Sequence, residues 1–240
     1  MIRKWPWFAW AFRKAIAGHL RDGLDGIYAS GWKQAQAVSA AGPFILAPTH
    51  VAYWDTLLML YVEDLLGADG YALMERANYD RLPFFGWVGA IPVDRNNSRP
   101  AIRAAVTRLD RPGRMMVVFP QGRQRPSHLR PLDLQRGIEL IARQSQAVVQ
   151  PLALAYAFHE SPRPTVYLDF PPAMEVGRDA RGFLSRLEEE LVAGLERIDR
   201  WVDEGSGAFD TLVARSTMVR PGLGMRILGW AARWGSRGST

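Results

Sequence analysis

Short apolar runs alternate with segments of helical periodicity along most of the chain, and this alternation restricts the possible fold most strongly. The apolar runs are typical of buried strands. Strands that alternate with helices indicate an α/β fold, with helices covering a mixed, largely parallel central sheet. The expected strands are 43–49, 70–75, 89–94, 114–120, 148–157 and 164–170, and the expected helices lie near 55–67, 98–110, 134–146 and 178–203.

Composition favours a single domain over residues 1–240. The chain is 48% hydrophobic, which suffices for a substantial core, and no repeat or low-complexity segment divides it. We expect a helical N-terminal segment over 1–35, a core over 43–175 and a helical C-terminal segment over 176–240. The two terminal segments are expected to be amphipathic.

His50 and Asp55 are the leading candidates for catalytic residues. They follow the apolar run 43–49, and Asp55 falls near the start of the expected helix 55–67, as an N-cap or first-turn acid. Imidazole can take a proton from an alcohol near neutral pH, and a carboxylate on its other nitrogen fixes the tautomer and stabilises the imidazolium. The pair predicts hydroxyl activation without a serine or cysteine nucleophile. The alternative is that His50 is an ordinary loop histidine and that Asp55 only caps the helix.

The same spacing occurs a second time, between His128 and Asp133. Pro126 and Pro131 lie within this second segment and indicate an irregular loop. The context between a strand and a helix therefore favours His50.

Three further motifs follow His50 in order, over residues 82–95, 115–123 and 148–153. Together with His50 and Asp55 they resemble the four sequence blocks of the glycerolipid acyltransferase family, whose best-known members are the 1-acylglycerol-3-phosphate acyltransferases. The resemblance spans 43–155 and includes Arg136-Gly137, where the family usually has a basic residue and a glycine.

The resemblance implies an enzyme that moves a fatty acyl group from acyl-CoA or acyl carrier protein to a hydroxyl of a lysophospholipid such as lysophosphatidic acid. His50 would be the general base, Asp55 its partner, and Arg95 a cationic contact for the acceptor phosphate, since a guanidinium binds oxygens bidentately. Main-chain amides near Gly122 could stabilise the oxyanion. The expected substrate-binding residues are Arg95, Gln121, Gly122, Arg123 and Arg125.

The third motif departs from the family pattern. The family usually reads Phe-Pro-Glu-Gly-Thr-Arg-Ser, whereas residues 119–125 read Phe-Pro-Gln-Gly-Arg-Gln-Arg. Gln121 removes a negative charge, and Gln124 occupies the usual arginine position. In the first motif, Thr49 and Ala52 replace the usual Asn and Ser. These differences leave open an aminolipid or glycosylated-lipid acceptor, or a noncatalytic lipid-binding homologue.

Cofactor motifs are missing from the sequence. The chain has no cysteine, and its four histidines do not form a clustered metal-ligand pattern. Neither a phosphate-binding loop nor a glycine-rich dinucleotide motif occurs. We therefore expect no metal and no cofactor besides the acyl donor.

The formal charge of +6 permits contact with anionic lipid or nucleic acid. The aromatic run 5–12, flanked by basic residues, is far shorter than the roughly 18 residues that span a bilayer. Residues 223–234 repeat apolar side chains at helical spacing. We expect both segments to contact the cytoplasmic side of a membrane peripherally; covering the protein's own core or a dimer interface is the alternative.

Nucleic-acid binding is the competing class. It is disfavoured because the aromatic residues gather at the chain ends and in 82–87, without a recognised nucleic-acid-binding pattern. Phe84, Phe85 and Trp87 could either bound an acyl groove or pack as ordinary core.

Overall fold

The fold is organised around β2 (Phe44–Pro48), in which all five residues are buried. A strand that is covered on both faces is continuously apolar rather than alternating. Phe44 and Leu46 contact the hydrophobic cluster on one face of the sheet, and Ile45 and Ala47 contact the cluster on the other. The alternate directions of neighbouring side chains thus place β2 between two apolar layers.

The computed structural model describes residues 4–177, 180–204 and 210–213, and in this part of the chain the sheet has eight strands in the order β4-β3-β5-β2-β6-β7-β1-β8. The β6–β7 and β1–β8 pairs are antiparallel, and the remaining pairs are parallel. The other strands are β1 (Gly26–Ser30), β3 (Asp69–Glu75), β4 (Ala90–Val93), β5 (Arg114–Val117), β6 (Val148–Ala157), β7 (Thr165–Asp169) and β8 (Asp210–Val213). The predicted mixed, largely parallel sheet is confirmed.

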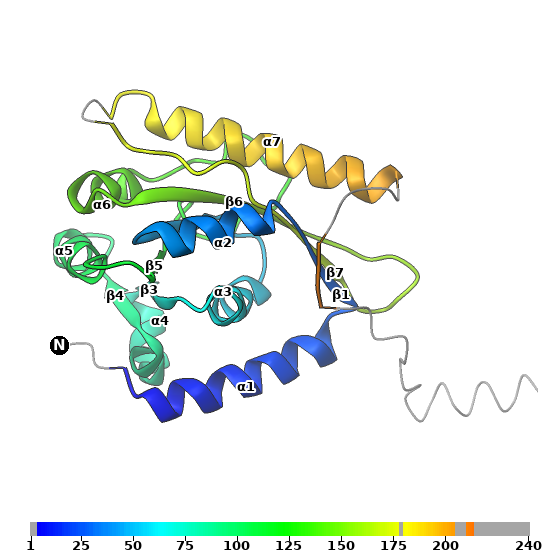
Figure 1. The fold of residues 1–240 in the computed structure, drawn as a ribbon, viewed down its shortest axis with the longest axis horizontal. Helices are drawn as coiled ribbons and strands as arrows, with labels where there is room; N and C mark the ends of the chain where they lie inside the picture. The colour runs from blue at the N-terminus through cyan, green and yellow to red at the C-terminus, as the bar shows by residue number, and fades with distance from the viewer. Residues whose placement is uncertain (1–3, 178–179, 205–209, 214–240) are drawn as a thin grey trace, which may run out of the picture.

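Helices cover both faces of the sheet. Helices α1, α2 and α3 contribute to one hydrophobic cluster, and α5, α6 and α7 contribute to the other. Figure 1 shows α1 and α7 on opposite sides of the molecule. The helices are α1 (Pro6–Gly23), α2 (Trp32–Ala41), α3 (Trp54–Leu65), α4 (Arg76–Arg81), α5 (Arg99–Arg108), α6 (Gly137–Ser145) and α7 (Phe183–Glu204), with a 3₁₀ helix η1 at Pro83–Val88.

The expectation of a wholly helical segment over 1–35 is wrong. Strand β1 lies inside this segment and pairs in parallel with β7. Five residues between Asp25 and Gly31 are too few to show a clear periodicity, and their partner strand is distant in the sequence. In the C-terminal segment, β8 follows α7 and pairs with β1. The predicted interfacial helix at 223–234 lies outside the described residues.

Aromatic side chains join α1 to η1. Trp5 stacks on Trp87 with ring centroids 4.7 Å apart. Phe12 contacts Phe84 and Phe85 edge to face, each at 5.8 Å. Of the two interpretations of the 84–87 aromatics, the structure favours packing, because their neighbours are side chains of α1 and of its N-cap residue Trp5.

Partly buried ion pairs also hold α1 and the residues just before it to the body of the fold. Lys4 Nζ lies 2.8 Å from Asp69 Oδ1 and 3.5 Å from Glu63 Oε1. Arg13 also bonds to Glu63, which is 3% exposed and accepts a further bond from the amide of Gly70. Burial of a carboxylate requires such partners. The position of α1 therefore depends on charge as well as on apolar contacts.

Asp69 should make the stability of the fold depend on pH in the acid range. Partial burial alone would raise the pKa of Asp69, but the hydrogen bond from Lys4 and the charges of Lys4, Arg114 and Arg111 lower it below its ordinary value. Between these two pKa values the unfolded chain binds more protons than the folded chain. The stabilisation by ionised Asp69 is therefore fully present above the ordinary Asp pKa, and it is lost as the pH falls through the lower pKa that Asp69 has in the folded protein.

We expect Asp69→Asn to lower the Tm at pH 7 by about 2 °C, as for a partly exposed ion pair. The difference from wild type should shrink below about pH 4. Thermal unfolding between pH 3 and pH 8 measures this difference in Tm. The control is Asp80→Asn, because Asp80 lies on the surface, 3.7 Å from Arg76. A pH-independent difference would contradict the assignment.

Candidate active site

The predicted catalytic pair lies beyond the carboxyl end of β2. In open parallel sheets, the loops at the carboxyl ends of strands form the usual ligand-binding edge. Strand β2 pairs with β5 on one side and β6 on the other. The segment after β2 is therefore flanked by the segment after β5 and by the distal part of β6.

The structure brings His50 and Asp55 together. His50 Nδ1 lies 2.7 Å from Asp55 Oδ2, and the Asp55 side chain is completely buried. The same oxygen accepts bonds from the amides of Val51 at 2.6 Å and Ala52 at 2.8 Å. Asp55 is a first-turn residue of α3, but its carboxylate binds the loop before the helix. This geometry fixes the carboxylate against one ring nitrogen.

The imidazole of His50 is held from several directions. Its ring stacks on Phe119, with centroids 4.1 Å apart. Its amide donates to Gln121 Oε1 at 2.7 Å, and its carbonyl accepts from the amide of Arg125 at 2.8 Å. The side chain is 16% exposed. Within the described residues Nε2 has no partner, so this nitrogen is available to a substrate hydroxyl.

Tyr156 completes the site and was not predicted. Its hydroxyl donates to Asp55 Oδ1 at 2.7 Å. Burial raises the pKa of the Tyr156 phenol far above its usual range, and the Asp55 carboxylate raises it further, so Tyr156 remains a protonated donor. Leu152, Leu154 and Tyr156 lie on the same face of β6, because alternate residues of a strand share a face. A polar hydroxyl at the end of this apolar face is the sequence feature that could have indicated Tyr156.

The turn after β5 requires a glycine. Gly122 has φ +67°, and a Cβ there would lie 3.3 Å from Gln135 Cγ. Its amide donates to the carbonyl of Phe119 at 3.0 Å. That amide is engaged within the turn, so any oxyanion donor must be a neighbouring amide rather than Gly122 itself. Gln121 is buried at 3% exposure, beside the His50 backbone.

The candidate arginines have different surroundings. Arg95 donates to the carbonyl of Gly122 at 3.0 Å and to Glu75 at 2.9 Å, while more than half of its side chain is exposed. Arg123 and Arg125 each lie 3.3 Å from Asp133. Arg95 is therefore brought to the turn of the site, whereas the other two guanidiniums hold the loop that follows it.

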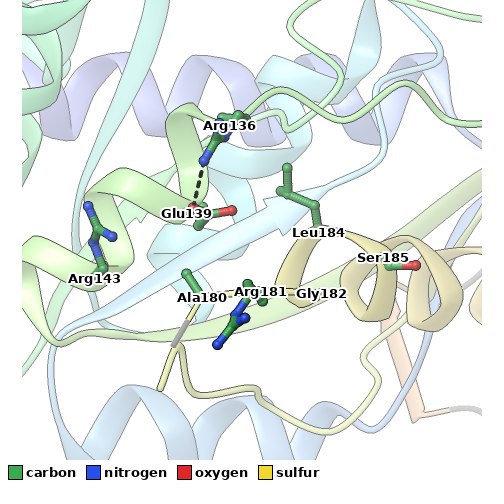
Figure 2. Close-up of a pocket in the computed structure, with 8 residues that line it drawn as sticks. All are labelled: Arg136, Glu139, Arg143, Ala180, Arg181, Gly182, Leu184 and Ser185. Atoms are coloured by element: carbon green, nitrogen blue, oxygen red, sulfur yellow. Dashed lines mark ion pairs between the residues drawn. The ribbon is translucent and has the colours of Figure 1, made fainter. Parts of the chain in front are cut away.

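Arg136 is not among the groups bonded to His50 or Asp55. It lines a hollow of about 470 Å³ between α6 and the start of α7, as Figure 2 shows, and lies 3.7 Å from Glu139. The lining residues are Arg136, Glu139, Arg143, Ala180, Arg181, Gly182, Leu184 and Ser185.

Neither a metal cluster nor a spanning helix occurs in the described part of the chain. No group of three or more His, Cys, Asp or Glu side chains there could hold a metal ion. No helix there is long and apolar enough to cross a membrane. The expectation that the protein needs no metal and no cofactor besides the acyl donor stays a prediction.

Comparison with known proteins identifies the family. No curated protein matches the chain. The crystal structure of the 1-acyl-sn-glycerophosphate (LPA) acyltransferase PlsC from Thermotoga maritima is similar in fold, with a TM-score of 0.56 and 18% sequence identity over 73% of each chain. The family model for the acyltransferases matches residues 32–155, more than half of the 240 residues. The chain therefore belongs to the acyltransferase family.

Proposed function

We propose that this acyltransferase moves a fatty acyl group from acyl-CoA or acyl carrier protein to a hydroxyl of a lysophospholipid such as 1-acylglycerol-3-phosphate, in phospholipid biosynthesis. The observation that carries the proposal is the His50–Asp55 pair, bonded at 2.7 Å through Nδ1. It leaves Nε2 for the acceptor hydroxyl. The fold shared with PlsC from Thermotoga maritima supports this class of acceptor.

The reaction needs one base and one oxyanion site. His50 Nε2 takes the hydroxyl proton as the oxygen attacks the thioester carbonyl, and Asp55 stabilises the imidazolium that forms. Amides beside Gly122 stabilise the oxyanion of the tetrahedral intermediate. Collapse breaks the carbon–sulfur bond, and the leaving thiolate takes the proton from His50. The ester and the free thiol are the products.

Arg95 is the proposed contact for the acceptor phosphate, because it lies against the turn at Gly122 and keeps more than half of its side chain exposed. We expect Arg95→Ala to raise the KM for lysophosphatidic acid about tenfold while changing kcat little, as for the loss of a charged hydrogen bond. Initial rates at varied acceptor concentration measure this effect.

Arg76→Ala is the matched control, since Arg76 is also more than half exposed and pairs with a surface aspartate. An unchanged acceptor KM in Arg95→Ala would reject the phosphate contact. It would favour an acceptor without a phosphate at that position, such as an aminolipid or a glycosylated lipid.

The outer face of α1 is proposed to contact the cytoplasmic surface of a membrane. Trp7 and Trp10 are 66% and 64% exposed, and the exposed Lys14 follows them at helical spacing. Exposed tryptophans beside cations are typical of helices that lie in the bilayer interface. The inner aromatics of α1 already have partners in η1, so membrane contact concerns the outer face.

We expect the double variant Trp7→Ala/Trp10→Ala to bind vesicles of anionic phospholipid at least about tenfold more weakly than wild type. Turnover of a short-chain, water-soluble acceptor should not change. Phe158→Ala, which removes another exposed aromatic side chain at 69% exposure, is the control. Equal vesicle binding by wild type and the double variant would reject this surface.

A panel of donors and acceptors tests the activity itself. Purified protein is incubated with long-chain acyl-CoA or acyl carrier protein and with lysophosphatidic acid, other lysophospholipids, aminolipids and glycolipids, and products are identified by mass spectrometry. An acylated lysophospholipid supports the proposal. Product from an aminolipid or a glycolipid alone would show that this lipid, and not a lysophospholipid, is the acceptor. Lipid binding without product would favour a noncatalytic homologue.

A further inference from the structure

Asp55 has more hydrogen-bond partners than a simple orienting residue requires. Oδ2 accepts from the His50 ring and from the amides of Val51 and Ala52. Oδ1 accepts from the hydroxyl of Tyr156 at 2.7 Å. Tyr156 lies on β6, 101 residues further along the chain, so the two ends of the carboxylate are bonded to different parts of the fold.

We propose that Tyr156 is a positioning residue for the reaction proposed above: its hydroxyl holds the Asp55 carboxylate against His50 and limits the basicity of that carboxylate. A carboxylate held at one oxygen only could rotate about its Cβ–Cγ bond. The Tyr156 bond at Oδ1 opposes that rotation and keeps Oδ2 at Nδ1. Without it, a completely buried oxygen would lack a partner, which is costly.

The hydroxyl also affects the proton on the His50–Asp55 pair. A donor to the charged form of a carboxylate lowers its proton affinity. Tyr156 therefore favours the state in which the transferred proton stays on the imidazole. The phenol does not itself give up a proton near neutral pH, because burial and the Asp55 charge raise its pKa. Tyr156 acts through Asp55 and does not serve as acid or base.

Strand pairing fixes the distance between Tyr156 and the base. Thr49, the residue before His50, donates through its amide to the carbonyl of Leu152 at 3.0 Å. Its hydroxyl accepts from the amide of Leu154 at 3.0 Å and donates to the carbonyl of Leu154 at 3.3 Å. The residue before the base is thus bonded to the strand that presents Tyr156. Such rigid support is what a preorganised site needs.

The titratable groups of this network come from three elements. They are His50 in the loop after β2, Asp55 on α3 and Tyr156 on β6. The segment after β5 contributes Phe119 and Gln121, which do not titrate, and Arg125, whose amide bonds the His50 carbonyl and whose guanidinium pairs with Asp133. A shift in the pH profile can therefore be assigned to these three side chains.

Tyr156→Phe tests the proposal, because it removes the hydroxyl and keeps the ring. We expect kcat to fall about tenfold and both KM values to stay within about twofold. Loss of the donor makes Asp55 more basic, so the His50 imidazolium is stabilised and the acid limb of the kcat/KM profile moves to higher pH by about half a unit or more. Tyr167→Phe removes a hydroxyl of β7 that bonds His159 in the loop after β6 and should leave the profile unchanged.

NMR titration of the His50 ring separates this proposal from the proposed function, because it needs no turnover. The chain has four histidines, and His50→Ala assigns the signal. A His50 pKa raised in Tyr156→Phe relative to wild type supports the positioning role, even if no donor or acceptor gives product. An unchanged His50 titration and pH profile, with only the Tm lowered, would overturn it and leave Tyr156 a purely structural residue.

Discussion

His50→Ala is expected to lower kcat by about a thousandfold or more, because it removes the proposed base for the hydroxyl proton. The expected change in Tm is small. Asp55 keeps its bonds to the amides of Val51 and Ala52 and to Tyr156, so its buried charge retains partners. Thiol release from the acyl donor measures kcat, and thermal unfolding of the same preparation measures Tm.

His128→Ala is a matched control, since His128 precedes Asp133 by the same spacing that separates His50 from Asp55. Asp133 is paired with Arg123 and Arg125, and no described residue bonds the His128 side chain. His128→Ala should therefore retain wild-type turnover. If His50→Ala kept more than about a tenth of the wild-type kcat, His50 would not be the base.

Asp55→Asn is the second change with a large expected effect, a loss of about a hundredfold to ten-thousandfold in kcat. Oδ2 accepts three hydrogen bonds, from the His50 ring and two amides. An asparagine oxygen there can still accept them, but it carries no charge to stabilise the imidazolium. If the amide nitrogen took that position, it would face two N–H donors.

Kinetics and unfolding together distinguish catalysis from stability for Asp55. Asp64→Asn, on the same helix but 48% exposed, is the control and should change neither quantity appreciably. The double variant His50→Ala/Asp55→Asn should be little slower than His50→Ala, because residues that act as a unit are not additive. Retained kcat with a lowered Tm would show that Asp55 only stabilises the start of α3.

The sequence predicts the middle of the sheet well because β5, β2 and β6 consist mostly of buried residues. The apolar run 43–49 corresponds to β2. The polar residues soon after it, His50 and Asp55, form the bonded pair that the sequence predicts, and this contact is local in the sequence. The strand expected at 114–120 ends earlier, at Val117, because the chain then enters the turn that requires Gly122. At these positions, residues that are close in the sequence were sufficient to predict both the strand and the contact.

Long-range contacts explain what could not be predicted. Strand β1 depends on β7, which is more than a hundred residues away, and nothing in residues 26–30 indicates that partner. Tyr156 reaches Asp55 across 101 residues. The candidate arginines are equivalent in the sequence, yet Arg95 bonds the turn at Gly122, whereas Arg123 and Arg125 lie near Asp133.

We propose acyl transfer to a lipid hydroxyl with His50 as the base. The most direct measurement follows the acylated lipid and the free thiol in one reaction, with wild type and with His50→Ala. We predict one acylated lipid for each thiol released by wild type, and neither product above background for His50→Ala. Thiol release without acylated lipid, or equal product from both proteins, would contradict the claim.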